Sequence, residues 1–167
     1  MSYIQTIDTD SLTNTSVTRE YDLGTRYVDY SSTDGVKSEY IYLRAHTGLS
    51  VNMPFQVSLS NVDASAITTK TPSTTTTGAM IVVPQVGVPS GYYFWGQYKG
   101  SATVLCTGFA TADFAEVINN GTSFILDGGA SGSTVESGTT LGIATSSTSG
   151  GLATFILSGN RVQVAAA

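Results

Sequence analysis

The stretch that decides the fold is rich in aromatic residues and reads Gly91-Tyr92-Tyr93-Phe94-Trp95-Gly96-Gln97-Tyr98-Lys99-Gly100. Successive side chains of an extended strand point to opposite faces, so Tyr92, Phe94 and Tyr98 share one face. Tyr93 and Trp95 lie on the other. One face can pack against the core of the domain. The second is covered either by the same chain, as in a central sandwich strand, or by a partner protein or a stacked sugar ring.

Alternation with a period of two continues along most of the chain, where short runs of Val, Ile, Tyr, Phe and Thr are separated by Gly, Ser, Asn and Pro. Asp34-Gly35 is a strong turn signal between the first two runs. The predicted strands are Thr25–Tyr30, Glu39–Arg44, Met53–Leu59, Ala79–Val83, Tyr92–Tyr98, Ala102–Gly108, Ser123–Leu126, Thr140–Thr145 and Leu152–Leu157. About nine short strands with little helical spacing predict a single all-β domain, built as a β-sandwich or a β-barrel.

The segments between the strands differ in character. Thr111–Ile118 fits either one helical turn or an irregular connection. Asn61–Thr77 and Asp127–Thr139 are rich in Ser, Thr and Gly, which predicts long loops. Residues 1–17 are polar without clear alternation, so we expect a polar N-terminal arm followed by one domain over residues 18–167.

Composition excludes several classes of function. The 167 residues include 7 Lys+Arg against 12 Asp+Glu, a net charge of −5, and only 11% of residues are charged. The polar surface therefore comes mainly from 25 Thr and 21 Ser. Because few basic residues are available to neutralise phosphates, we expect no nucleic-acid partner. No apolar run approaches the length of a membrane span, and the first residues lack the features of a signal peptide, so we expect no membrane association.

The chain offers few groups for chemistry. Cys106 is the only cysteine and alternates with Ala102 and Val104, which predicts a buried core residue rather than a nucleophile. His46 is the only histidine and falls on the outward side of its strand. Asp8-Thr9-Asp10 has the spacing of a metal site but lacks the further oxygen ligands that a hard cation needs. We therefore expect no catalytic residue, no cofactor and no metal ion, and a protein that is not an enzyme.

Four segments, in order, resemble small capsid decoration proteins, also called cement proteins, of tailed bacteriophages. Phe94-Trp95-Gly96-Gln97-Tyr98-Lys99-Gly100-Ser101-Ala102-Thr103-Val104 is similar to the family's Gly-Trp-x-Gln-x-x-Gly-x-Ala-x-Val stretch. The other three are Leu23-Gly24-Thr25, Glu39-Tyr40-Ile41-Tyr42-Leu43-Arg44 and Gly150-Gly151-Leu152-Ala153-Thr154-Phe155-Ile156-Leu157. The chain departs from the family at Phe94, where a Gly usually precedes the Trp, and beside Arg161, where the usual Pro is missing.

The resemblance implies a virion structural protein, made in the host cytoplasm and bound to the capsid exterior, whose partner is the major capsid protein. It also implies a homo-oligomer, for which a trimer is our first expectation and a dimer the second. Interface energy is concentrated in Tyr, Trp and Arg, so the predicted contact residues come from the outward side of one strand and from the aromatic stretch. They are Tyr40, Tyr42, Arg44, Tyr92, Trp95 and Tyr98. The alternatives are a carbohydrate-binding β-sandwich, with Trp95 stacking on sugar, and a phage tail or fibre component.

Overall fold

A computed structural model describes residues 12–30, 35–57, 63–65, 80–107, 114–119, 124–127 and 142–159. Within these residues the regular structure is all β, as predicted. The strands are β1 (Arg26–Asp29), β2 (Ser38–Ala45), β3 (Phe55–Val57), β4 (Asp63–Ser65), β5 (Met80–Pro84), β6 (Tyr93–Thr107), β7 (Phe114–Asn119), β8 (Phe124–Asp127), β9 (Gly142–Ala144) and β10 (Leu152–Ser158).

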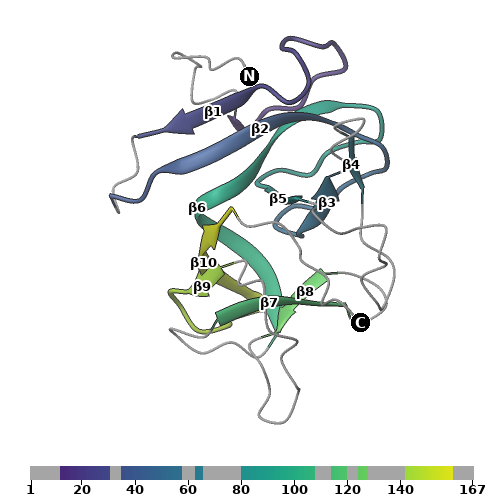
Figure 1. The fold of residues 1–167 in the computed structure, drawn as a ribbon. Coiled ribbons are helices and arrows are strands. Elements are labelled where there is room, and N and C mark those ends of the chain that lie inside the picture. The colour runs from purple at the N-terminus through teal and green to yellow at the C-terminus, as the bar shows by residue number, and fades with distance from the viewer. Residues whose placement is uncertain are drawn as a thin grey trace, which may run out of the picture.

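The strand pairings close into two rings that share β6. In the first ring β2 pairs with β4, β4 with β3, β3 with β5, β5 with β6, and β6 again with β2. In the second, β6 pairs with β10, β10 with β9, β9 with β7, β7 with β8, and β8 with β6. We term these rings the first and second barrels. Figure 1 shows β6 curving from one half of the molecule into the other. Of the two predicted architectures, the pairings are those of a barrel, because closure leaves neither ring with an open edge of its own.

Each barrel has an apolar interior that follows the predicted alternation. In the first, Ile41 and Leu43 of β2 pack with Phe55, Val82 and Phe94. In the second, residues of the later half of β6 pack with β9 and β10, and all are buried: Ala102, Val104, Cys106, Ala144, Ala153, Phe155 and Leu157. Ile81 and Val83 of β5 join this second cluster, which links the two cores. The predicted burial of Cys106 is confirmed.

The predicted interruption between Tyr92–Tyr98 and Ala102–Gly108 is wrong, because β6 continues without a break for 15 residues. Gly100 takes a φ of +91°, and a Cβ there would lie 2.5 Å from the carbonyl oxygen of Lys37. Glu39 pairs with Lys99 while Tyr40 pairs with Gln97, so the strand carries a bulge at this point. The glycine therefore bends β6 from one barrel into the other instead of ending it.

Two connecting segments also differ from the prediction. Phe114–Asn119 forms β7, so the helical turn predicted over Thr111–Ile118 is wrong; pairing with β8 and β9 outweighs the weak helical signal. Asp63–Ser65, within the predicted loop Asn61–Thr77, forms β4. Three predicted segments lie outside the described residues: the rest of that loop, residues 128–139 of the predicted loop Asp127–Thr139, and the Asp8-Thr9-Asp10 motif.

Candidate interaction surface

The aromatic face of β6 is covered by the chain's own N-terminal segment, residues 12–25, which we term the strap. Trp95 and Tyr42 are each only 2% exposed and share a buried cluster with Leu12 of the strap and Tyr27 of β1. The ring of Tyr21, also from the strap, lies 5.2 Å from that of Tyr42 and 5.4 Å from that of Trp95, measured between centroids. Edge-on and tilted ring contacts of this kind add to the energy of burial.

Hydrogen bonds at several points hold the strap on the first barrel. Ser16 and Tyr93 exchange two backbone bonds, of 3.0 and 2.8 Å. The backbone N–H of Gly24 donates to the carbonyl oxygen of Tyr42 at 2.8 Å. The N–H of Glu20 donates to the Tyr42 hydroxyl at 3.1 Å. Burial raises the pKa of that hydroxyl, which keeps it protonated at neutral pH.

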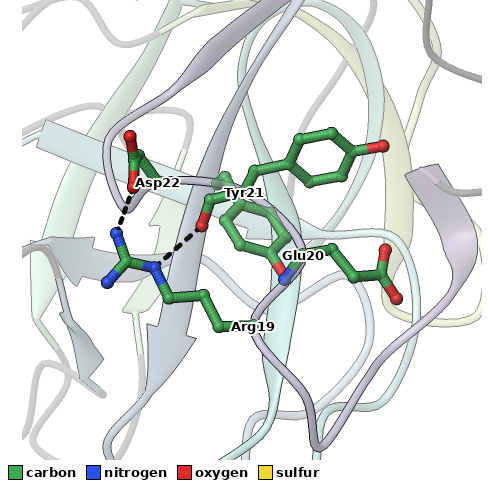
Figure 2. A network of polar contacts seen from close by, with 5 residues as sticks. Arg19, Glu20, Tyr21 and Asp22 are labelled. Atoms are coloured by element: carbon green, nitrogen blue, oxygen red, sulfur yellow. Dashed lines mark hydrogen bonds and ion pairs between the residues drawn. The ribbon is translucent and has the colours of Figure 1, made fainter.

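Arg19 fixes the shape of the strap where it turns toward β1. Figure 2 shows its guanidinium lying against the following residues. Its Nε donates to the carbonyl oxygen of Tyr21 at 3.0 Å, and its Nη2 pairs with Asp22 at 2.5 Å. Both charged side chains are well exposed, so the ion pair adds little stability. Its contribution is to set the local conformation that presents Tyr21 to the cluster.

Three of the six predicted contact residues are therefore buried by the chain's own fold. Tyr42 and Trp95 are 2% exposed and Tyr98 is 7% exposed. The expectation that Tyr42 points outward is wrong, because the strap covers that side of β2. For the same reason Trp95 offers no open ring for a sugar. The aromatic strand is a central strand covered on both faces by its own chain, one of the two possibilities left by the sequence.

Tyr98 is the extra residue of the bulge in β6 and has a structural role there. Its hydroxyl donates to Glu39 Oε2 at 2.6 Å, and Lys99 Nζ lies 2.8 Å from Glu39 Oε1. The Arg26 guanidinium sits 5.4 Å from the centre of the Tyr98 ring. Burial alone would raise the pKa of Glu39, but the hydrogen bonds from Lys99 and Tyr98 and the charges of Lys99 and Arg26 outweigh it and lower that pKa. These groups join β1, β2 and β6.

The other three predicted contact residues keep part of their surface open. Arg44 is exposed, and its Nε donates to the carbonyl oxygen of Gly91 at 3.3 Å. Tyr92 is partly buried close by, since Arg44 pairs with the neighbouring Tyr93. Tyr40 is also partly buried and lies four residues earlier on β2, roughly 13 Å from Arg44 at the usual rise per residue. The structure thus brings Arg44 and Tyr92 together and leaves Tyr40 apart.

The only cysteine and the only histidine of the chain lie in different environments. His46 is exposed just after β2, as predicted. Cys106 is buried in the second barrel, with its Sγ 3.4 Å from Thr148 Oγ1, and burial raises the pKa of its thiol. Among the described residues there is no cluster of His, Cys, Asp and Glu that could hold a metal ion. No helix in these segments is long and apolar enough to cross a membrane.

The second barrel carries an outward surface that the sequence analysis did not single out. It consists of the outward side chains of three neighbouring strands, in cross-strand rows: Ser101, Ile156 and Ile143; Thr103, Thr154 and Thr145; Leu105 and Leu152. We term it the uncharged face. Ile143 and Ile156 pair with each other across β9 and β10 and are 41% and 37% exposed, so two large apolar side chains are adjacent on this surface. The sequence feature that could have pointed to this surface is the complete lack of charged residues over 142–159.

No protein-family model matches the chain, and no curated protein matches its sequence. Among solved structures, the chain is similar to the N base of the head fibre protein gp8.5 of bacteriophage phi29. The identity is 11%, the TM-score is 0.46, and the match covers 75% of this chain and 98% of the other. A likeness of this degree does not establish a shared function.

Proposed function

We propose that this protein is a structural component of a tailed-bacteriophage virion that decorates the capsid exterior, by binding the outer surface of the major capsid protein lattice. The observation that carries the proposal is the resemblance of Phe94–Val104 to the decoration family. In the structure this stretch is part of β6, the strand shared by both barrels. The remaining resembling segments lie next to it: β2 and β10 both pair with β6, and Thr25 bonds to Tyr42 of β2.

The proposed mechanism is purely interfacial. Each copy bridges neighbouring capsid subunits and buries surface across the joints between them, which opposes the outward pressure of packaged DNA. The copies act as homo-oligomers at symmetry axes of the shell, with a trimer as the first expectation and a dimer as the second. A low density of charge favours close packing of many copies side by side, because like charges on neighbouring copies are few.

Arg44 and Tyr92 are the strongest candidates for the contact with the shell. Both combine partial exposure with the side-chain types that dominate interface energies. We expect Arg44→Ala and Tyr92→Ala each to weaken co-sedimentation with capsids that lack this protein. Ser149→Ala, at an exposed site just before β10 and outside the proposed contacts, is the matched control. Equal binding by all three variants would remove this pair from the interface.

The decisive experiment for the function is the copy number of the chain in purified virions, measured by quantitative mass spectrometry against the major capsid protein. A simple ratio to the shell subunit supports decoration. A handful of copies per particle would instead identify the tail or fibre alternative. Absence from particles would overturn the virion proposal, and binding in a glycan array would then favour a sugar-binding module that does not depend on Trp95.

A further inference from the structure

The charged side chains of the described structure are unevenly distributed. Most lie on the strap, in and around β1 and β2, and at Lys99 near the middle of β6; the remaining charged residues are Asp63 of β4, Glu116 of β7 and Asp127 of β8. By contrast, residues 101–106 of β6 and residues 142–159, which include β9 and β10, contain no Asp, Glu, Lys, Arg or His. Lys99 borders the uncharged face at one end, where it pairs with Ser158.

The uncharged face has the composition of an interface core. It combines the exposed Ile143 and Ile156 with Leu105 and Leu152, and a row of threonines runs between these two groups. Interface cores are depleted in charged residues. Threonine hydroxyls both donate and accept hydrogen bonds, so a threonine row can pair with an identical row.

We infer that the uncharged face packs against the same face of a second copy of this chain, across a two-fold axis. The inference rests on the homo-oligomeric part of the proposed function and selects the dimer over the trimer, because a face that pairs with itself closes after two copies. Each chain has a net charge of −5, so two copies repel one another. The repulsion is smallest where both surfaces are uncharged.

The charge pattern also argues for an identical partner over a different one. A different protein would attract this acidic chain most strongly by placing basic groups opposite its carboxylates, none of which belongs to the uncharged face. The uncharged face gives such a partner no electrostatic advantage. Its eight residues are fewer than the 20 to 30 per side of a typical stable interface, so this contact is expected to be weak, with a dissociation constant of about 1 μM or higher.

Sedimentation equilibrium of the full chain, from about 1 μM to about 1 mM, tests the inference. We expect a reversible dimer whose dissociation constant rises at least tenfold in Ile156→Lys. Val51→Lys is the matched control, because Val51 is 47% exposed and lies outside the uncharged face. A monomer throughout the range, a trimer, or an equal effect of the two substitutions would overturn the inference.

Cross-linking provides a second measurement that does not depend on a charge-introducing variant. In Ile156→Cys the only other thiol is that of Cys106, which is buried and has a raised pKa. A short bis-maleimide should therefore join two copies through residue 156, whereas Val51→Cys should give no linked dimer. Failure of Ile156→Cys to cross-link would count against the contact. If the wild-type chain dimerises but does not bind capsids, the result would count against the proposed function and not against this contact.

Discussion

Replacing Trp95 with alanine tests whether the strap closes the aromatic cluster in the folded protein. The indole is 2% exposed and lies 5.1, 5.4 and 6.3 Å from the ring centres of Tyr42, Tyr21 and Tyr27. Truncating a buried aromatic side chain to alanine costs roughly 3 to 5 kcal/mol. Three ring contacts are lost together and the site lies between strap and barrel, so we expect a cost of about 4 kcal/mol.

A loss of about 4 kcal/mol is a large share of the roughly 5 to 15 kcal/mol that stabilises a typical domain. For a chain of this size it corresponds to a fall in Tm of roughly 8 to 16 °C. Urea denaturation and thermal melting followed by far-UV circular dichroism measure the change, because the only tryptophan is absent from the variant.

Two further substitutions make the test specific. Trp95→Phe keeps most of the buried ring and should cost about 1 to 2 kcal/mol. Val51→Ala removes a half-exposed apolar side chain on the same barrel and should change stability by less than about 0.5 kcal/mol. If Trp95→Ala folded with a loss below about 1 kcal/mol, the strap would not cover this ring in solution, and Trp95 would return to the set of surface contact residues.

Three other substitutions probe the junction between the barrels. Gly100→Ala should lower the free energy of unfolding by about 2 kcal/mol or more in chemical denaturation, because residue 100 has a positive φ and the new Cβ would lie 2.5 Å from the Lys37 carbonyl oxygen. Gly87→Ala is the control: there is open space around that position, so the substitution should be nearly neutral. Gln97→Leu should cost about 1 to 3 kcal/mol, since the two N–H groups of the buried amide serve three nearby oxygens that would lose this partner; no loss would mean that water replaces the amide. Glu39→Gln should change the pH dependence of stability. The pKa of Glu39 is lowered on folding from its ordinary 4.5, so its stabilising contribution is present above that value and is lost as pH falls through the folded pKa. The wild-type advantage over Glu39→Gln should therefore shrink on acidification, and a constant difference would contradict the network.

The strands were predictable wherever the alternation in the sequence matched one buried face. Ile41, Leu43 and Ala45 are all buried in the first barrel, and the next residue, His46, is exposed, as expected. The same holds for Cys106 in the second barrel. Local periodicity carries this information because each inward side chain contributes its own burial energy.

Closure of the two barrels was not predictable from the same signal. It depends on the parallel pairings β2–β4 and β6–β8, which are two-residue contacts between chain segments that local patterns do not connect. The bulge at Tyr98 and the bend at Gly100 were also missed, because a glycine between two predicted strands is a turn signal more often than a bend within one strand.

The candidate site shows where alternation stops being informative. Alternation correctly predicted that Tyr42 and Leu43 point to opposite faces of their strand, and likewise Trp95 and Phe94. It cannot identify what covers the face that carries Tyr42 and Trp95. The cover is the strap, whose Tyr21 lies about 70 residues before Trp95 in the chain and whose polar sequence gave no strand signal. On the uncharged face the situation is reversed. Ile143 and Ile156 pair across β9 and β10, and no described segment covers them as the strap covers Trp95. The chain itself buries the aromatic strand but leaves the isoleucine pair exposed. We therefore expect two copies of the chain to contact each other through the second barrel and not through Trp95.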